Sequence, residues 1–499
     1  MTHLVNKLKL RELVKSSVRY KHGPDHWSVL KKKKTAKDKA LQHFDEFYGN
    51  VYGDNWKNIR AALLKENSKY VAVVNNFSDT DRIRSKLELL GAIHLKALYN
   101  VYKEHLKSQS TSKTVQTKDV RNVMDTLISN TQLSELQSIY PADHQHTAQA
   151  LNTEENDETI TTNNALQPVK LQSIEEELNE IELDNDRIID SSINVSMLHE
   201  YIPATKIKGM DDWELESDHY RFYNKAADFK VDIVKESVLS FPEHLHVYTF
   251  EEGNDSRFPS PRKGSTGVLD YYLFDGGSIL PVLALDIKLG DVVLDMCAAP
   301  GGKALTILQT LMPRLLVAND NMQSRVKRIE NVMEQYVSDV YETEKMFYLT
   351  ERDARTIDEK DVYDKILVDV PCTTDRHVLH TDENNMFKPT RLKERLNIPE
   401  LQSEILTNAL KLVKVGGTVV YATCSLSPIQ NDGVVHVALK KSWEETDSVM
   451  IVKDITEALM PLKYIYKFGK IGLKYGNIVV PSLRSNWGPM YFCKIVRVR

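Results

Sequence analysis

The sequence is poor in cysteine: there are only four in 499 residues, and no two of them form a Cys-x-x-Cys pair. This scarcity excludes a disulfide scaffold and the usual structural zinc sites, and it is typical of a reducing compartment. The chain also lacks any uninterrupted apolar run of the roughly 20 residues that a membrane-spanning helix requires. We therefore expect neither a membrane span nor a resident metal ion.

A general surplus of basic residues is missing too. The net charge of the chain is −5, but regional values differ sharply, with +9 for residues 1–40, −12 for 107–215 and −3 for 216–499. The last region is the part most typical of an enzyme. If that region acts on nucleic acid, its general electrostatic attraction to phosphates is weak.

The length of the chain predicts more than one structural region. Residues 1–39 are basic and amphipathic like a mitochondrial transit segment, although a solvated basic terminus has the same composition. Residues 40–106 predict a small, largely helical N-terminal module. Residues 107–215 are acidic and poor in aromatics, which predicts a mostly disordered insertion. Residues 216–499 then form the main domain.

Within this last region, apolar segments of strand length alternate with amphipathic helices. Such alternation predicts an α/β fold with a doubly wound, mostly parallel sheet. Ligands of these sheets lie beyond the carboxyl ends of the strands. The predicted strands are 292–296, 315–319, 346–349, 365–370 and 418–423, and the predicted helices are 303–311, 323–336, 399–413 and 427–441.

The first chemical motif is the segment Asp295–Lys303, which reads Asp-Met-Cys-Ala-Ala-Pro-Gly-Gly-Lys between a predicted strand and a predicted helix. Small residues let a ligand approach the backbone closely, and free amides at a helix start favour a carboxylate or phosphate. A Gly-Gly pair alone is more often a simple tight turn. However, the next strand ends in Asp320, a carboxylate suited to the hydroxyls of a ribose. The pair of features favours a nucleoside cofactor.

Two of the four cysteines also follow predicted strands. Cys372 stands in Asp369-Val-Pro-Cys372, and Cys424 stands in Thr423-Cys-Ser. A lone cysteine is usually a small buried hydrophobe. Two cysteines at the edge where the ligand cleft is expected instead indicate a reactive thiolate.

In this order the motifs resemble the Sun-domain family of RNA cytosine-5 methyltransferases, which use S-adenosylmethionine. The resemblance runs from about Arg257 to the C-terminus and includes Arg325 and the tripeptide 352–354. Most members read Pro-Cys-Ser-Gly where residues 371–377 read Pro-Cys-Thr-Thr-Asp-Arg-His. That variant is similar to the mitochondrial ribosomal RNA members of the family. Four further segments share this similarity: Ala40–Asp45, Val74–Phe77, Glu383–Lys388 and Trp487–Lys494.

The chemistry of this family requires two groups. Carbon 5 of cytosine is a poor nucleophile until a thiolate adds to carbon 6, and the adduct must later be released. The resemblance implies that Cys424 is the nucleophile, that Cys372 assists release, and that Asp369 hydrogen-bonds the base edge. It also implies cofactor contacts from Gly301, Gly302, Lys303, Asp320, Arg325, Asp353, Ala354 and Asp369.

The other polar or reactive residues near these motifs are expected to be structural. We expect Asp375 and His377 to belong to an exposed polar loop. Cys297 lies in the predicted cofactor loop and should be packed. Cys493 lies in an apolar terminal segment and should be part of the core.

The resemblance further implies a substrate, a compartment and a partner. These are mitochondrial small-subunit ribosomal RNA in the matrix, with a role in mitoribosome assembly, and a heterodimer with a helical-repeat protein of the mitochondrial transcription-termination-factor (mTERF) family. A base in paired RNA must be unstacked before it can react, and the weak charge of the main domain favours help from a partner. Three alternatives stay open: a transfer RNA cytosine-5 methyltransferase, an assembly factor with dispensable catalysis, and a DNA-type enzyme with Cys372 as nucleophile.

Overall fold

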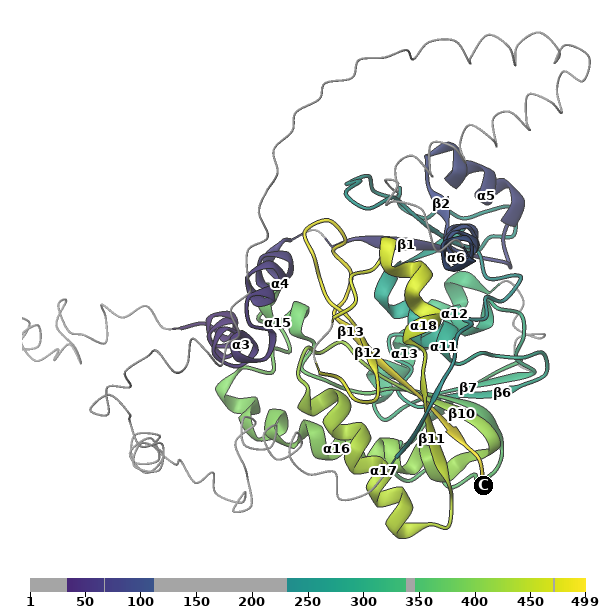
Figure 1. Cartoon of the computed structure of the whole chain (residues 1–499). Coiled ribbons are helices and arrows are strands. Elements are labelled where there is room, and N and C mark those ends of the chain that lie inside the picture. Colours follow the sequence, from purple (N-terminus) through teal and green to yellow (C-terminus); the bar gives the residue numbers. More distant parts are fainter. Residues whose placement is uncertain (1–33, 67, 112–230, 338–345, 470–471) are drawn as a thin grey trace, which may run out of the picture. The chain divides into compact units, whose positions relative to one another are not determined.

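The computed structural model describes residues 34–66, 68–111, 231–337, 346–469 and 472–499 (Figure 1). Most of the predicted transit segment, residues 1–33, and nearly all of the predicted acidic insertion lie outside the described residues, whereas residues 34–39 are described and lead into the first helix. The chain divides into two compact units, Met1–Lys107 with Glu214–Arg499, and Ser108–Trp213. Apart from the end of one helix, every element below belongs to the first unit.

The larger sheet has nine strands within the described residues. They are β3 (Asp232–Lys235), β6 (Val292–Asp295), β7 (Leu315–Asp320), β8 (Phe347–Glu351), β9 (Tyr363–Asp369), β10 (Val413–Thr423), β11 (Met450–Asp454), β12 (Asn477–Val479) and β13 (Met490–Arg497). Their order is β3-β11-β13-β10-β9-β6-β7-β8, with β12 paired to β13. The strands from β10 to β8 are parallel, whereas β13 is antiparallel to each of its three partners, β10, β11 and β12. The predicted mostly parallel α/β sheet is confirmed.

The helices that connect these strands are α12 (Gly302–Leu308), α13 (Gln323–Tyr336), α16 (Leu392–Leu412) and α17 (Val434–Glu445). All four were predicted, with two shifted starts. Helix α16 begins seven residues before Pro399, which lies inside the helix. The short 3-10 turn η3 (Pro389–Arg391) leads directly into the helix and so moves its start toward the N-terminus. Helix α17 begins late because the wider turn η4 (Ile429–Gly433) precedes it.

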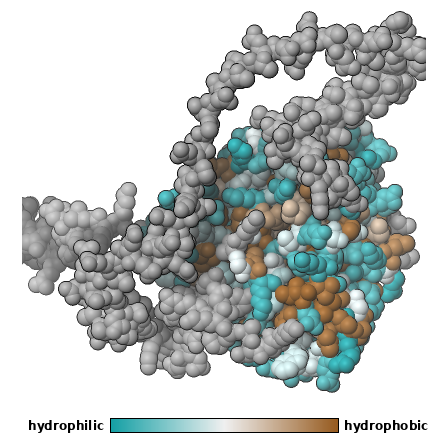
Figure 2. Space-filling model, viewed as in Figure 1, coloured by the Kyte–Doolittle hydropathy of each residue, from teal (hydrophilic) through white to brown (hydrophobic). Residues whose placement is uncertain are grey.

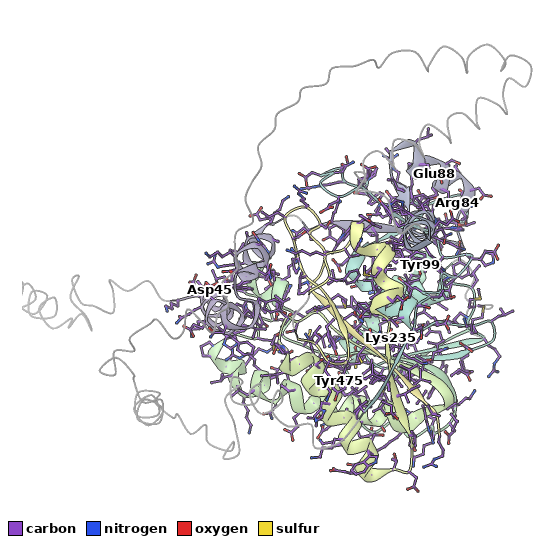
Figure 3. The ribbon with its side chains drawn as sticks, in the orientation of Figure 1. Asp45, Arg84, Glu88, Tyr99, Lys235 and Tyr475 are labelled. Carbon is purple, nitrogen blue, oxygen red and sulfur yellow. The ribbon has the colours of Figure 1, made fainter. Side chains whose placement is uncertain are left out.

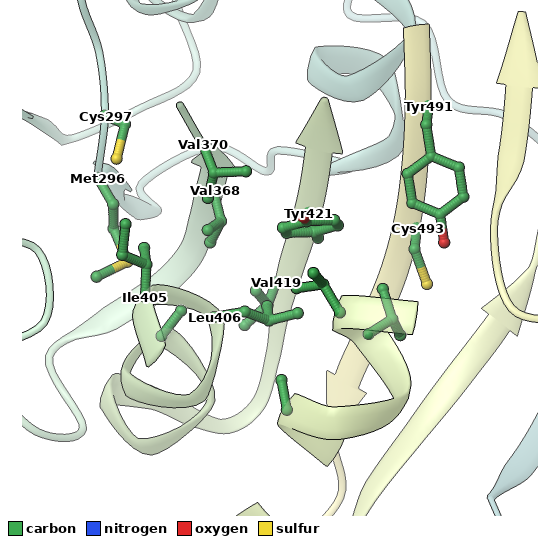
Figure 4. Close-up of a cluster of buried hydrophobic side chains, with 14 of the residues drawn as sticks. Met296, Cys297, Val368, Val370, Ile405, Leu406, Val419, Tyr421, Tyr491 and Cys493 are labelled. Carbon is green, nitrogen blue, oxygen red and sulfur yellow. The ribbon is translucent and has the colours of Figure 1, made fainter. Parts of the chain in front are cut away.

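Alternate residues of the central strands point to opposite faces of the sheet, and both faces are buried. On one face, Val368 and Val419 join a core cluster with Ile405 of α16 (Figure 4). On the other face, Leu367 and Val420 join a second cluster that also contains side chains of α12 and α13. Helices on both faces explain why the central strands are almost uniformly apolar.

A second, antiparallel sheet has the order β2-β4-β1-β5. It combines β1 (Tyr70–Val74) and β2 (Ile93–His94) with β4 (Val247–Thr249) and β5 (Tyr271–Asp275). The segment 40–106 was predicted as largely helical, and its helices are present, but the two strands were missed. Their partners lie more than 150 residues further along the chain, for example Val73 opposite Val247. No local pattern reveals such pairing.

The remaining helices belong mostly to the N-terminal segment. They are α3 (Ala36–Tyr52), α4 (Asn55–Leu64), α5 (Thr80–Leu89), α6 (Leu95–Thr111), α11 (Ile279–Ala284), α15 (Asp375–His380) and α18 (Thr456–Leu459). Helix α3 starts at a capping box formed by Thr35 and Asp38. Asp45 on α3 accepts hydrogen bonds from Trp56 and Arg60 of α4, which fixes the two helices together (Figure 3).

Figure 2 shows that apolar side chains gather toward the bottom of the face viewed there. Exposed apolar residues of the described chain include Ile233 and Val234 on β3, which is an edge strand of the large sheet. None of the helices in the described ranges combines the length and the apolar character that a membrane span requires.

Candidate active site

The two motif cysteines lie together. Cys372 follows β9 and Cys424 follows β10, and these strands are parallel neighbours in which Ala422 is paired with Asp369. Both loops therefore leave the same edge of the sheet. The two Sγ atoms are 3.1 Å apart, within reach of a thiol hydrogen bond. The prediction that the cysteines gather at the carboxyl ends of the strands is confirmed.

An ion pair lies beside the cysteines. Lys303, in the first turn of α12, places its Nζ atom 2.7 Å from Oδ2 of Asp369, the last residue of β9. Burial alone lowers the pKa of Lys303, but the adjacent Asp369 carboxylate raises it above its ordinary value. The ammonium group therefore stays charged. It orients the Asp369 carboxylate and adds positive charge to the site.

The two glycines before Lys303 are required for different reasons. Gly301 has a φ of +110°, in the left-handed region that favours glycine. At Gly302, a Cβ atom would lie 2.7 Å from Cε2 of Phe274 and 3.0 Å from Cε1 of Tyr272. The aromatic face of β5 therefore packs directly against the loop and leaves no room for a side chain.

A pocket adjoins this loop and contains four of the predicted cofactor residues. Asp320 ends β7, and its Oδ2 atom is 3.2 Å from Nη2 of Arg325, which also donates to the carbonyl oxygen of Ala299. Asp353 and Ala354 follow β8 and line the same pocket. The other lining residues are Met296, Cys297, Asn321, Arg355, Pro371, Leu401 and Ile405. Since Pro371 precedes Cys372, the pocket reaches the cysteine loop.

Comparison with known proteins identifies the family. The family described as 16S rRNA methyltransferase RsmB/F matches residues 282–460, which contain both cysteines and the cofactor loop. The 5-cytosine rRNA methyltransferase nsun-4 of Caenorhabditis elegans is 34% identical over 484 residues, which cover 93% of each chain. The chain belongs to the Sun-domain family of RNA cytosine-5 methyltransferases. It is thus a methyltransferase that uses S-adenosylmethionine.

Two further relatives show how far the similarity extends. The 5-cytosine rRNA methyltransferase NSUN4 of Bos taurus is 45% identical over 257 residues, 51% of this chain and 67% of that protein. A tRNA (cytosine(34)-C(5))-methyltransferase, mitochondrial, of Danio rerio is 36% identical over 244 residues, 48% of this chain and 65% of that protein. The similarity to the nematode protein therefore covers far more of this methyltransferase than the similarity to the tRNA enzyme.

The residues of this methyltransferase fit its cofactor, as a buried carboxyl group beside the loop shows. Neither side-chain oxygen of Asp295 has a hydrogen-bond partner among the described residues, although both are buried. Burial and the nearby Asp369 carboxylate raise the pKa of Asp295 to about 8. A buried acid without a partner suits the ammonium group of a methionine moiety, just as the Asp320 carboxylate suits ribose hydroxyls. Sequence reasoning included Asp295 in the motif but gave it no role.

Asp375 corrects one prediction. It was expected in an exposed polar loop, but it is 0% exposed and begins α15. The reason lies in Thr374, whose φ of +48° turns the chain inward after the cysteine. His377, two residues later, is exposed as expected. No sequence signal distinguished the two residues, because the backbone turn decides which of them is buried.

The remaining cysteines are core residues of the methyltransferase, as predicted. Cys297 and Cys493 are both buried, and burial raises the pKa of each thiol well above its ordinary value. Both are therefore neutral at physiological pH. Across the described ranges, no three His, Cys, Asp or Glu side chains gather in a way that could hold a metal ion.

Proposed function

We propose that this methyltransferase forms 5-methylcytosine in mitochondrial small-subunit ribosomal RNA through a covalent adduct between Cys424 and carbon 6 of the base. The observation that carries the proposal is the cysteine pair, with 3.1 Å between sulfur atoms beside the Lys303–Asp369 ion pair. A single buried cysteine would be explained by packing. Two thiols that meet at the ligand edge of the sheet require a chemical explanation.

In the first step the Cys424 thiol loses its proton to solvent, and the resulting thiolate sulfur adds to carbon 6. A hydrogen bond to Cys372 and burial raise the pKa of Cys424, so the resting group is a neutral thiol, whereas the Lys303 ammonium favours the thiolate. Asp369 accepts a hydrogen bond from the amino edge of cytosine and stabilises the ring as the sulfur adds. Carbon 5 then has the electron density of an enamine.

Bound S-adenosylmethionine supplies an electrophilic methyl group that carbon 5 can attack. The adduct then carries both a methyl group and a proton on carbon 5, and it is released only when that proton leaves. Cys372 lies 3.1 Å from the nucleophilic sulfur, and its deprotonated form, the thiolate, is placed to accept the proton and become a neutral thiol. The electrons of the broken C–H bond re-form the ring double bond, and the carbon–sulfur bond to Cys424 breaks.

The cofactor-binding residues have separate roles in this proposal. Gly301, Gly302 and Lys303 would lie near the methionine part of the cofactor, where the two glycines leave room for its close approach. Asp320, which is held by Arg325, would accept hydrogen bonds from the ribose hydroxyls. Asp353 and Ala354, which line the pocket, would contact the adenine. The Arg355 guanidinium, which hydrogen-bonds Asp353, keeps the pKa of this carboxyl low and orients it.

The extent of the similarity supports ribosomal RNA over transfer RNA. The rRNA-modifying relative of the nematode matches 93% of the chain, whereas the tRNA-modifying relative matches 48%. The N-terminal helix α3, moreover, contacts the cysteine loops directly, since Tyr48 donates to Asp375. That contact involves the Thr-Thr-Asp variant of the motif. A transfer RNA substrate remains the second candidate.

A mitochondrial matrix location, a role in mitoribosome assembly and a heterodimer with an mTERF-family protein complete the proposal. The partner would compensate for the weak charge of residues 216–499, which is −3. Tight binding of small-subunit RNA by the purified chain alone, at physiological salt, would contradict this part.

Bisulfite sequencing of mitochondrial and cytosolic ribosomal and transfer RNA tests the substrate and the compartment. Depletion of the protein should remove methylation at one mitochondrial small-subunit site, and wild type but not Cys424→Ala should restore it. Loss of a transfer RNA site instead would favour the second candidate. Normal ribosome assembly with Cys424→Ala would show that the protein acts as an assembly factor with dispensable catalysis.

A further inference from the structure

A single buried carboxylate connects the two cysteine loops. Asp375 accepts hydrogen bonds from the Thr373 hydroxyl at 2.5 Å, the Ser425 hydroxyl at 3.2 Å and the backbone N–H of Leu426 at 2.7 Å. Thr373 is the neighbour of Cys372, and Ser425 is the neighbour of Cys424. The Thr373 and Ser425 hydroxyls also lie 3.0 Å apart. The carboxylate thus fixes the residue next to each sulfur.

The same carboxylate is connected to the N-terminal helix. Tyr48 of α3 donates to Oδ2 of Asp375 at 2.8 Å, and Tyr52, one turn later, donates to the carbonyl oxygen of Leu426 at 2.8 Å. Residues four apart lie on one face of a helix, so α3 presents one hydroxyl to Asp375 and the other to the Cys424 loop. Both tyrosines are buried, and their hydroxyls would be costly to leave without partners.

The backbone between Cys372 and Asp375 is held in an unfavourable conformation. Thr374 has a φ of +48° and a ψ of +60°, in the left-handed region that β-branched residues rarely adopt. Such a residue persists only where its surroundings impose the conformation. The hydrogen bonds to Asp375, the residue after Thr374, supply that constraint, because they hold Asp375 against the Cys424 loop.

We propose that Asp375 is a positioning residue that sets the separation of the Cys372 and Cys424 sulfur atoms, and that Tyr48 completes its shell. Helix α3 is then part of the active site rather than of a separate module. The catalytic meaning of this assignment rests on the proposed function of the two cysteines. The positioning of the two sulfur atoms by Asp375 does not depend on that proposed function, and it can be measured without RNA or cofactor.

The test compares Asp375→Asn with a matched control, Asp432→Asn. Asp432 is also buried, and it accepts hydrogen bonds from the backbone N–H groups of Lys474, Tyr475 and Gly476 and from the Tyr491 hydroxyl, none of which belongs to the loops that carry Cys372 and Cys424. Oxidised glutathione reports the sulfur separation: the two thiols lose two protons and two electrons to form one disulfide, and glutathione disulfide becomes two glutathione thiols. The equilibrium gives the effective concentration of one cysteine at the other.

We expect Asp375→Asn to lower this effective concentration at least tenfold, and to lower kcat similarly with little change in S-adenosylmethionine affinity. The control variant should leave both values close to wild type. Tyr48→Phe removes one hydrogen-bond donor to Asp375 and should lower both the effective concentration and kcat by a smaller factor. If Asp375→Asn fails to fold, the Tyr48→Phe result tests the proposal instead.

Unchanged disulfide equilibria in folded Asp375→Asn and Tyr48→Phe would overturn the proposal. A fall in turnover without a change in the disulfide equilibrium would also overturn it, since the carboxylate would then act chemically. If wild type transferred no methyl group to RNA, the proposed function would fail, but the disulfide comparison would still decide whether Asp375 positions the sulfurs.

Discussion

The charges around Cys424 decide when its thiol can act as a nucleophile. The hydrogen bond to Cys372 raises its pKa most, burial raises it further, and the Asp369 carboxylate adds to both, whereas Lys303 opposes them. At neutral pH most Cys424 is therefore protonated. Because the thiolate is the nucleophile, its population should limit the rate of adduct formation.

The pH dependence of adduct formation follows from the raised pKa of Cys424. Between pH 7 and 9 each unit should increase the thiolate population, and the single-turnover rate with small-subunit RNA, by up to about tenfold. Cys372→Ala removes the largest cause of the raised pKa and should shift this rise to lower pH. Identical profiles for wild type and Cys372→Ala would show that the hydrogen bond does not govern the nucleophile.

Sequence reasoning could predict the two cysteines because their positions depend only on the strands before them. Cys372 and Cys424 follow apolar strands, and parallel neighbours end at one edge. Asp375 could not be predicted in the same way. Its burial depends on the φ of Thr374, a local conformation that the composition of a polar loop does not reveal. The unpartnered state of Asp295 likewise depends on its surroundings in space.

At the scale of elements, the cofactor helix is supported by a strand that sequence patterns missed. The Nε2 group of Gln309, at the C-terminal end of α12, donates to Asn75 at 2.9 Å, and the N–H of Asn76 donates to Gln309 at 2.7 Å. Both asparagines follow β1 directly. The segment Val74–Phe77, noted only as a family resemblance, thus holds the end of the helix that carries Lys303.

Loss of this support should destabilise the protein. Gln309→Ala would leave the Asn76 N–H without its partner and would leave the Asn75 amide oxygen with only the Phe77 N–H, at a cost of about 1 to 3 kcal/mol in the free energy of unfolding. Urea unfolding measures this value. The control Gln323→Ala, at the exposed start of α13, should change stability by less than about 0.5 kcal/mol. Equal stability of the two variants would contradict a supporting role.

The small sheet should be sensitive to acid. His94 on β2 and His246 before β4 lie with ring centroids 5.6 Å apart, and both are near Arg84 of α5, which Figure 3 labels. Burial, His246 and Arg84 lower the pKa of His94 to about 4, and burial also lowers the pKa of His246. The unfolded chain protonates His94 below about pH 6.5, but the folded chain does not protonate it until about pH 4.

Stability from His94 is thus fully present above pH 6.5 and declines as the pH falls toward 4, by at most about 1.4 kcal/mol per unit. Urea midpoints at pH 7 and pH 5 should differ less in His94→Phe than in wild type. His377→Gln, a change at an exposed position, should behave as wild type. An equal loss in His94→Phe and wild type would contradict the burial argument.

At the scale of the whole molecule, segments far apart in the sequence meet at α15. Arg376 donates to the carbonyl oxygen of Gly488 at 2.7 Å and to Asn486 at 2.8 Å. His380 of the same helix contacts the carbonyl oxygen of Leu63 at 2.7 Å. The cysteine motif, the N-terminal helices and the C-terminal tail therefore form one structure. Sequence reasoning recognised their resemblances separately, because nothing along the chain shows that they touch.

The measurement that tests the account most directly is covalent trapping of small-subunit RNA with the cysteine variants, with S-adenosylmethionine present. Cys372→Ala should accumulate an RNA-linked protein, because the adduct forms but is released slowly. Cys424→Ala should form no linked species and lose at least about a hundredfold in turnover. Loss of the adduct in Cys372→Ala and its retention in Cys424→Ala would reverse the two roles, as in a DNA-type enzyme, and would contradict the account.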